Sequence, residues 1–289
     1  MKRPTIAIVG SGRLGSALAL QLHAAGYDVS EIASRNHAKS LGSAKRLAQK
    51  IGAHAAQLRT AKLSADLIWV CVPDSQIAPL SNELSRKSWG GQFAFHSSGV
   101  LSSDVLTPLR KKGARIASVH PLMTFIDRSL PNLTGVSFAI EGNPSALRVA
   151  AAIAKDLGGI PRRIRKQAKP AYHAFATMIC PLLVALLTTA EEAARAAEIP
   201  SQQARKRMLP IVQQTIANYV KLGPARAFTG PIVRGDAETI QLHLKALAGT
   251  PVAGNTYAAL AQAALELLPC KNEEELKKLL GRFSLRSQR

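Results

Sequence analysis

Polar side chains that could take part in chemistry follow the apolar runs of the N-terminal half of this sequence. They are Asp74, Ser97, Ser98 and His120, which follow the runs 67–72, 92–96 and 115–119. If these runs are parallel strands, their carboxyl ends meet at one edge of the sheet, where ligands of open α/β sheets bind. Histidine titrates near neutral pH, so His120 could exchange a proton with such a ligand. The alternative is that His120 caps its strand by bonding the backbone, and the sequence leaves both interpretations open.

Lys169 and His173 form a second group that could carry chemistry. They are four residues apart, which places them on one face of a helix if that helix begins in time. Pro170 fits the first turn of such a helix and would leave Lys169 at its start. Lys169 also adjoins the basic segment 162–166, so it could face solvent or a bound phosphate instead. We therefore favour His173 over Lys169 as the residue that faces a ligand.

The segment 229–236 is a third candidate. Glycine and proline bracket it, so it predicts a loop between helices, and loops often carry sites. Arg234 could bind a substrate carboxylate through its planar guanidinium, or it could have no ligand. Thr229 is a further candidate for binding substrate. Asp236 precedes a predicted helix and fits an N-cap better than a binding role.

A glycine-rich turn supplies the element that could position these groups around a ligand. The β-branched run 5–9 leads into Gly-x-Gly-x-x-Gly, and the helix-forming run 14–25 follows at once. Gly10 allows the tight turn, Gly12 lets a pyrophosphate approach the backbone, and Gly15 lets the helix pack close to the strand. The helix then directs N–H groups and the positive end of its dipole at the phosphates. The alternative is a glycine-rich turn that binds nothing. The residues expected to contact a dinucleotide are Gly10, Ser11, Gly12, Arg13, Leu14 and Gly15, together with Val72, Pro73 and Asp74.

The end of the second predicted strand, 28–33, indicates which dinucleotide would bind. An NAD site has Asp or Glu there to hold the ribose 2′-hydroxyl, whereas an NADP site has groups that accept a 2′-phosphate. Here the strand runs into Ser34, Arg35 and Asn36, and Glu31 lies mid-strand. Arg35 can pair with a phosphate through its planar fork, and Ser34 can donate its hydroxyl. The sequence therefore favours NADP(H) over NAD, the alternative being that Arg35 is merely solvated.

Strands and helices alternate up to about residue 165. The predicted strands are 5–9, 28–33, 67–72, 92–96, 115–119 and 136–141. The predicted helices are 14–25, 36–51, 75–87, 102–112 and 144–157. This alternation is typical of a doubly wound parallel sheet. We therefore expect an α/β protein with a Rossmann-type dinucleotide-binding domain over residues 1–165.

Beyond residue 165 the sequence predicts helices alone. They are 170–197, 201–222, 237–247, 250–268 and 273–282. Several are apolar on more than one side, which indicates burial in a bundle or against a second subunit. We expect an all-α domain for substrate binding and dimerisation over residues 166–289, and a homodimer built through it.

The composition limits the classes of protein that remain. The chain has 289 residues, of which 47% are hydrophobic, enough for two globular domains. The longest mostly apolar run, 178–190, is shorter than a bilayer requires and contains Pro181. No signal peptide fits before the first strand, so a cytoplasmic protein without a membrane partner is expected. Cys71, Cys180 and Cys270 predict buried thiols and no metal site.

The net charge of +20 would suit a nucleic-acid-binding protein. The charge is spread along the chain, however, and aromatic residues for base stacking make up only 4%. A basic protein also attracts anionic cofactors and substrates. We therefore expect no specific nucleic-acid partner.

A glycine-rich α/β half followed by a helical half resembles the 6-phosphogluconate-dehydrogenase-like superfamily, which includes pyrroline-5-carboxylate, ketopantoate, β-hydroxyacid and prephenate dehydrogenases or reductases. The chain is most similar to a family of predicted oxidoreductases with an N-terminal Rossmann-like half and a C-terminal domain of unknown function. The stretches that carry this resemblance are His96–Gly99, His120–Leu122, Tyr172–His173 and Phe228–Asp236. It covers nearly the whole chain and implies fold and cofactor class, not a substrate.

The resemblance also implies roles for the candidate residues. As in prephenate dehydrogenase, a serine ends one strand and a His-Pro pair follows the next, so His120 would be the acid, base or oxyanion partner, and Ser97 or Ser98 would hold it or the substrate. β-Hydroxyacid dehydrogenases have Lys-x-x-x-Asn with lysine as proton donor, and here His173 stands in place of the asparagine.

These features together imply an NADPH-dependent oxidoreductase acting on the carbonyl or imine of a small carboxylate, with a ketopantoate-like 2-oxo acid as the first substrate to try. A non-catalytic NADP-binding sensor or scaffold is the main alternative, and a basic nucleic-acid-associated protein is the lesser one.

Overall fold

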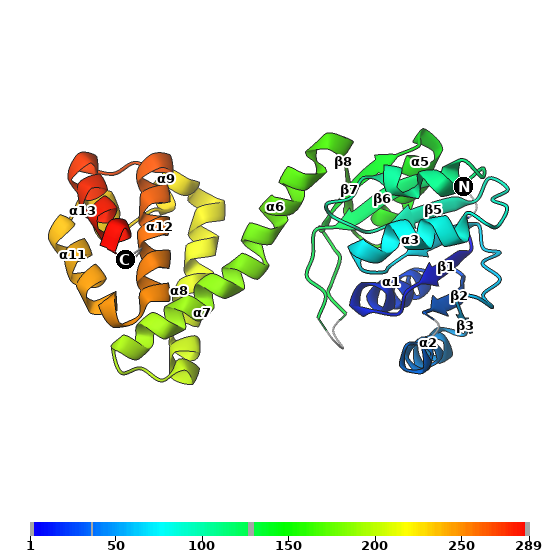
Figure 1. Ribbon diagram of the computed structural model, residues 1–289, viewed down its shortest axis with the longest axis horizontal. Coiled ribbons are helices and arrows are strands. Elements are labelled where there is room, and N and C mark those ends of the chain that lie inside the picture. Colours follow the sequence, from blue (N-terminus) through cyan, green and yellow to red (C-terminus); the bar gives the residue numbers. More distant parts are fainter. Residues whose placement is uncertain (1–2, 36, 127–129, 287–289) are drawn as a thin grey trace. The chain divides into compact units, whose positions relative to one another are not determined.

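The computed structural model describes residues 3–35, 37–126 and 130–286 and divides into two compact units, Met1–Thr177 and Met178–Arg289. The first unit contains an eight-stranded sheet in the order β3-β2-β1-β4-β5-β6-β7-β8 (Figure 1). The strands are β1 Ile6–Val9, β2 Val29–Ser34, β3 His54–Gln57, β4 Leu67–Val70, β5 Phe93–His96, β6 Arg115–Pro121, β7 Ser137–Gly142 and β8 Ile160–Arg163. Neighbouring strands are parallel except β6 and β7. This Rossmann-like sheet followed by helices confirms the predicted fold class.

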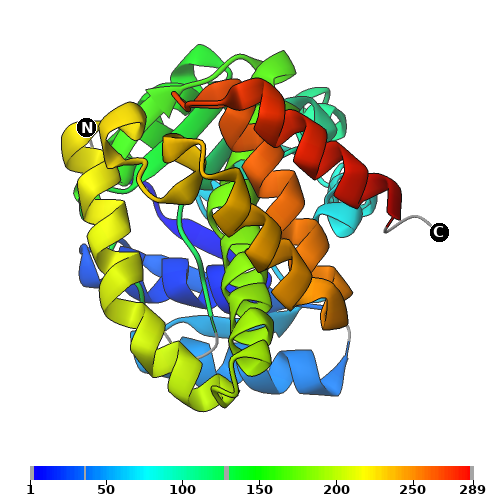
Figure 2. The ribbon, with the colours of Figure 1, turned by 90° about the vertical axis from the view of Figure 1, so that its left-hand side faces the viewer.

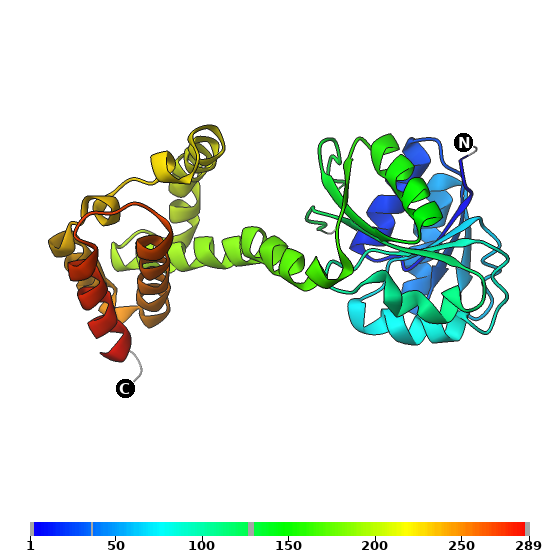
Figure 3. The same ribbon diagram turned by 90° about the horizontal axis from the view of Figure 1, so that it is seen from above.

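Helices cover both faces of this sheet because its central strands are apolar on both sides. Ile6 and Ile8 of β1 belong to one hydrophobic core, and Ala7 and Val9 belong to the other. The first core includes residues of α1 Arg13–Ala24, α2 Ala38–Ile51 and α5 Pro144–Asp156, and the second those of α3 Asp74–Leu84, η1 Ser103–Leu106 and α4 Thr107–Arg110. Figure 3 shows the sheet of the first unit with helices on either side.

The carboxyl ends of the parallel strands lie at one edge of the sheet. β1, β2, β4, β5 and β6 run in the same direction, so the loops that follow them emerge together. These loops include the glycine-rich loop after β1 and the residues that follow β4 and β5. Ligands of open α/β sheets bind at this edge.

Three features of the sheet differ from the prediction. β3 and β8 are absent from the predicted strands, since β3 reads His-Ala-Ala-Gln and β8 contains Pro161 and two arginines. Both are the outermost strands, where proline and polar residues are tolerated because one side of the strand is unpaired. The predicted doubly wound parallel sheet is mostly parallel, but β7 lies antiparallel beside β6.

The second unit is helical, as predicted. Its elements are α7 Pro181–Ala196, α8 Ser201–Leu222, α9 Pro224–Ala227, α10 Pro231–Arg234, α11 Ala237–Ala246, η3 Leu247–Gly249, α12 Pro251–Leu267 and α13 Glu273–Arg286. Leucine, isoleucine and alanine side chains of α11, α12 and α13 form one core, and Figure 2 shows these helices in orange to red. α8, α11, α12 and α13 begin within one residue of the predicted positions.

The predicted helix 170–197 is in fact two helices. α6 Lys169–Ile179 ends before Cys180, whose φ of −123° and ψ of −84° are not helical, and α7 starts at Pro181. Proline lacks the N–H that a continuous helix would need there, but it fits the first position of a new helix. Most of α6 groups with the first unit, so the contacts divide the chain later than the predicted boundary at residue 165.

The apolar segment around this break is longer than predicted. The stretch Lys166–Ala196 is long and apolar enough to cross a membrane by length and composition alone, whereas the predicted apolar run, 178–190, is shorter than a bilayer requires. Its beginning is nevertheless fixed inside a folded domain, because Lys169 is fully buried against β5 and β6 of the first unit. The cysteine prediction is also only partly right, because Cys71 is buried whereas Cys180 and Cys270 are partly exposed.

Candidate functional site

The three glycines of the motif differ in what the fold requires of them. Gly10 has a φ of +112°, and a Cβ there would lie 2.3 Å from the Cys71 carbonyl oxygen. A Cβ on Gly15 would lie 1.9 Å from the Gly10 carbonyl oxygen. Gly12 has an ordinary φ of −73°, and a Cβ there would meet nothing within 4 Å. The protein needs glycine at the first and third positions, whereas the open space over Gly12 suits an approaching pyrophosphate.

The start of α1 faces the same space. Gly12 is its N-cap, no side chain caps it, and its first turn carries no acidic residue. The N–H groups and dipole of this helix can therefore serve an anion. Arg13 is exposed at this end, and the Leu14 side chain packs against the first core, which leaves its backbone N–H at the start of the helix.

A cavity of about 530 Å³ extends from this loop across the ends of β1, β2 and β4. Its lining residues from the sequence predictions are Gly10, Ser11, Gly12, Ser34, Arg35, Val72 and Pro73. Lys39, Ser40 and Ser43 of α2 also line it. The sequence prediction did not include the two serines. They could have been found from their spacing, because positions 39, 40 and 43 lie on one face of a helix that begins just after the end of β2. Asn36 lies outside the described residues.

Two cations and several hydroxyl groups are therefore available where a 2′-phosphate would bind. Arg35 and Lys39 are exposed at the cavity, so both can turn toward a phosphate. Ser34 is buried and its Oγ lies 3.4 Å from the Ala56 carbonyl oxygen, so its hydroxyl proton is directed at the backbone. Ser43 Oγ likewise lies 3.3 Å from the Lys39 carbonyl oxygen, so Ser40 is better placed than either serine to donate to a phosphate.

Glu31 cannot take the part of the ribose-binding carboxylate of an NAD site. Its side chain is buried in β2, and its two oxygens accept hydrogen bonds from the N–H groups of Lys62 and Leu63 at 3.1 and 2.8 Å. Glu83 of α3 is the carboxylate among the residues that line the cavity, and it lies on the side of β4, not at the end of β2. The end of β2 thus keeps the basic character that the sequence predicted.

Lys169 is the most unusual group near this edge of the sheet, because its side chain is fully buried. Nζ donates to the Ser98 carbonyl oxygen at 2.9 Å and to Ser118 Oγ at 2.8 Å. Burial lowers the pKa of Lys169 to about 8, against the opposing effect of the Glu141 and Asp74 carboxylates. The alternative in which Lys169 faces solvent is therefore wrong, although this lysine does adjoin the basic segment.

His120 meets the start of α6 at the same place. Its Nδ1 lies 3.1 Å from the Tyr172 hydroxyl, and its ring stands edge-on to the ring of His173 with 6.1 Å between centroids. A Cβ on Gly99 would lie 2.4 Å from His173 Cδ2 and 2.9 Å from His120 Nε2. The absence of a side chain at Gly99 is thus what leaves room for both imidazoles.

The ionisation of His120 differs from the prediction. Burial, with the nearby charges of Lys169 and His173, lowers its pKa to about 4. The ring is therefore neutral at pH 7 and cannot serve as a cationic acid; it can donate or accept a hydrogen bond. Lys169, with a pKa of about 8, holds a transferable proton at neutral pH.

Ser97 and Ser98 are buried and serve the turn after β5. Ser97 Oγ accepts from the Trp69 indole N–H at 2.9 Å, and Ser98 Oγ accepts from the Leu101 N–H at 3.0 Å. His96, to which the prediction gave no catalytic role, holds the same turn by accepting from the Ser98 N–H at 3.1 Å. The observed partner of His120 is Tyr172, not either serine hydroxyl, and Ser98 contributes through its carbonyl oxygen.

Thr229 and Arg234 belong to the second unit, where Thr229 precedes α10 and Arg234 is its last residue. The Arg234 guanidinium is largely exposed, with Nη2 3.9 Å from Asp236 Oδ2. Asp236 caps α11 by accepting from the Thr239 N–H at 3.0 Å, which confirms its predicted cap role. Substrate binding by Thr229 and Arg234 stays a prediction.

The first unit therefore has the sheet, the glycine-rich loop and the carboxyl-edge cavity of a Rossmann-like protein, and the family model for a Rossmann-like domain matches residues 1–121. A second model, a domain of unknown function named DUF2520, matches residues 136–264. The chain thus joins a Rossmann-like domain to a DUF2520 domain, which confirms the resemblance to the family with that arrangement. Among curated proteins, none matches the chain.

Solved structures with the same fold cover nearly the whole chain. A protein from Bacteroides fragilis described as a putative NADP oxidoreductase has a TM-score of 0.76 and 24% identity over 90% of this chain and 97% of its own. A protein from Thermotoga maritima has a TM-score of 0.69 and 23% identity over 99% and 100%. A reductive aminase from Aspergillus terreus, in complex with NADPH and ethyl-5-oxohexanoate, has a TM-score of 0.65 and 16% identity over 92% and 94%.

Proposed function

We propose that this chain is an NADPH-dependent oxidoreductase that reduces the carbonyl or imine carbon of a small carboxylate. The observation that carries this proposal is the open space over Gly12, continuous with a cavity that has Arg35 and Lys39 at the end of β2. Neighbours described as NADP oxidoreductases or crystallised with NADPH support the choice of cofactor. A ketopantoate-like 2-oxo acid remains the first substrate to test.

The residues present fit NADP(H) at each part of its length. The start of α1 and Gly12 would hold the pyrophosphate. Arg35, Lys39 and Ser40 would hold the 2′-phosphate. NADPH, when bound, supplies the hydride, and the protein supplies orientation and a proton.

The cluster at β5, β6 and α6 has the groups that the protonation step needs. Lys169 is cationic below its pKa of about 8 and can give a proton to the oxygen or nitrogen that gains charge as the substrate is reduced. His120 is neutral and is oriented by the Tyr172 hydroxyl 3.1 Å from Nδ1, so its other ring nitrogen can hydrogen-bond the substrate. His173 shares the space left by Gly99 and would line the same site.

Cofactor binding is the first experiment. NADPH and NADH are titrated into the purified protein by nicotinamide fluorescence, with Arg35→Asp compared against Lys45→Asp. Lys45 is exposed on α2 and does not line the cavity, so both variants change the net charge equally. We expect tighter binding of NADPH than of NADH, lost at least tenfold in Arg35→Asp alone. Equal affinities for both cofactors in the natural protein would refute the NADP assignment.

Turnover is the second experiment, because it separates an enzyme from a sensor that only binds NADP. A panel of 2-oxo acids, and of imines formed from amines and carbonyl compounds, is mixed with NADPH, and the fall in absorbance at the nicotinamide band is followed. Lys169→Met is expected to abolish oxidation of NADPH by the best substrate while leaving NADPH affinity within about threefold of the natural protein. Tight NADPH binding with no turnover across the panel would favour the sensor.

We also propose a homodimer through the second unit. Large apolar side chains are exposed on α7, α8 and α12, including Val220 at 78% and Leu267 at 80% of their full surface. Apolar surface of this extent marks an interface, and a second copy of the chain would cover it in a closed pair. Light scattering at micromolar concentration should give twice the mass of the chain, and Val220→Glu should lower it, whereas Lys206→Glu, on the same helix, should not.

A further inference from the structure

Three buried polar side chains lie next to one another across the middle of the sheet. His96 of β5 is the register partner of Ser118 of β6, and Ser118 is the register partner of Glu141 of β7. Their exposures are 0%, 0% and 3%. Directly paired residues on neighbouring strands point to the same face, with Cβ atoms about 5 Å apart. Burying a polar row in a sheet is costly unless each member is bonded, and each of these three side chains has a hydrogen-bond partner.

Lys169 binds the middle of this row. Its Nζ is 2.8 Å from Ser118 Oγ, and no part of its side chain is exposed. Ser118 is therefore bonded to a buried ammonium group while its register partner, Glu141, is a buried carboxyl group on the adjoining strand. A buried cation without an opposite charge is strongly destabilising, and one with a nearby carboxylate is tolerated. The antiparallel return of β7 is what brings these two charges to the same place.

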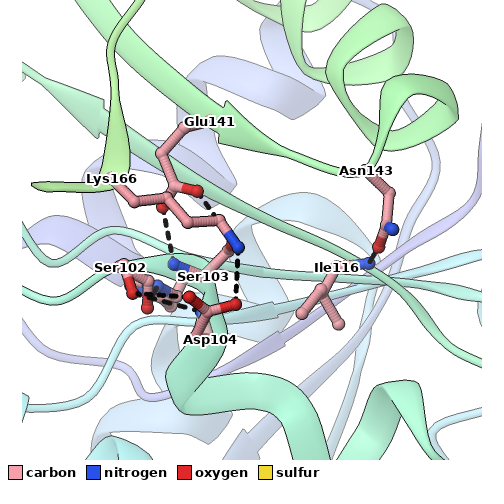
Figure 4. Close-up of polar contacts among 8 residues, drawn as sticks. Ser102, Ser103, Asp104, Ile116, Glu141, Asn143 and Lys166 are labelled. Atoms are coloured by element: carbon pink, nitrogen blue, oxygen red, sulfur yellow. Dashed lines mark hydrogen bonds and ion pairs between the residues drawn. The ribbon is translucent and has the colours of Figure 1, made fainter.

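Glu141 also bonds η1, which offers a simpler explanation of its burial. Figure 4 shows its carboxylate accepting from the Ser103 N–H and from Ser103 Oγ, the latter at 2.7 Å. The start of η1 has other support, however, because Ser102 Oγ accepts from the Asp104 N–H, and Lys166 forms an ion pair with Asp104 (Figure 4). A cap for η1 therefore does not account for a buried carboxylate beside Lys169.

We propose that Glu141 is a positioning residue that keeps Lys169 in its ammonium form by supplying a buried opposite charge from the strand beside Ser118. This inference rests on the proposed function in that Lys169 is the proton donor. The titratable groups whose charges influence Lys169, or are influenced by it, are Glu141 from β7, Asp74 from the start of α3, His96 from β5 and His120 from β6. Both histidines have lowered pKa values, to about 3 and about 4, and stay neutral. The two carboxylates thus supply the opposite charge, with Glu141 the stronger influence.

The test measures the titration of Lys169 directly, in protein without cofactor or substrate. Protein labelled with 13C at the lysine ε-carbons is titrated by NMR, and the Lys169 signal is the one missing from Lys169→Met. We expect a midpoint near pH 8 in the natural protein. In Glu141→Gln we expect the midpoint to fall by about one pH unit or more, which is a tenfold or larger loss in the ratio of ammonium to amine.

Glu31→Gln is the matched control, because Glu31 is also a buried carboxyl group whose two oxygens accept hydrogen bonds from a neighbouring segment. Its loss should cost stability without moving the Lys169 midpoint. An unchanged midpoint in Glu141→Gln, or an equal shift in both variants, would overturn the inference. If the midpoint falls as expected but no substrate is reduced, the inference about Glu141 stands and the proposed function fails.

A stability cycle covers the case in which Glu141→Gln does not fold. Lys169→Met removes the cation that Glu141 balances, so the double variant Glu141→Gln/Lys169→Met should refold and lose less stability than the sum of the single variants. Strictly additive losses, or a double variant that is as unfolded as Glu141→Gln, would show that Glu141 only caps η1 and would overturn the inference.

Discussion

Replacing Gly12 by alanine separates a glycine kept for a ligand from glycines kept for the fold. At the N-cap of α1, alanine is worse than glycine by about 0.5–1 kcal/mol. Because the φ of −73° suits alanine, the loss of chain entropy in the unfolded state returns about 0.4–1 kcal/mol. Since the new methyl group meets nothing within 4 Å, we expect the free energy of unfolding to stay within about 1 kcal/mol of the natural value.

Gly15→Ala is the contrasting variant, because its methyl group would lie 1.9 Å from the Gly10 carbonyl oxygen. The backbone must shift, and overpacking of this kind costs about 1–3 kcal/mol or more. Urea unfolding without cofactor measures both variants. In the same proteins NADPH fluorescence should show at least a tenfold loss of affinity for Gly12→Ala, about 1.4 kcal/mol, because the methyl group occupies the path of the pyrophosphate. Unchanged NADPH affinity in a stable Gly12→Ala protein would refute the placement of the pyrophosphate.

Three further outcomes are expected. His120→Asn should lower kcat at least tenfold with near-normal stability and NADPH affinity. The fall of kcat as pH rises through about 8 should persist in this variant, because it reports the loss of the Lys169 proton. Wild-type turnover in the variant would make His120 structural. Gly99→Ala should displace His120 and His173 and lower kcat while costing about 1–3 kcal/mol of stability, measured by urea unfolding and steady-state kinetics. The free energy of unfolding should fall as pH drops from about 6.5 to 4, by roughly 3 kcal/mol for each of His96 and His120. The reason is that both histidines bind a proton in the unfolded chain over this pH range but not in the folded one. Urea midpoints that do not change over this range would contradict those pKa values.

The Rossmann-like half was predictable because its signals are local. β-Branched runs, the glycine spacing and the alternation with helices each identify an element within a short window. β3 and β8 were not predicted, because an outer strand does not need a continuous apolar run and can contain proline. The break at Cys180 was missed because an alanine- and leucine-rich sequence favours one helix, and only the missing N–H of Pro181 opposes it.

The cofactor end of the site was also predictable, since the absence of a carboxylate at the end of β2 can be read from the sequence. The state of Lys169 could not be predicted in the same way. The basic segment 162–166 nearby suggests that the Lys169 side chain is exposed to solvent. Its burial depends instead on where α6 meets the sheet. The position of Glu141 depends on the direction of β7, and a β7 parallel to β6 would not give the observed pairing with Ser118.

The segment His96–Gly99 shows why residue type alone misdirects such predictions. A catalytic role was predicted for Ser97 and Ser98 because of their hydroxyl groups. In the structure these hydroxyl groups accept hydrogen bonds from Trp69 and Leu101 and stabilise the turn. The groups that reach the other candidates belong to the backbone, because the Ser98 carbonyl oxygen holds Lys169 and Gly99 leaves space for two imidazoles. A serine in a tight turn competes for nearby N–H groups before it can serve a ligand. The turn therefore contributes to the site by where it places a carbonyl group and an empty Cβ position, and variants of Gly99 should affect turnover more than variants of Ser97.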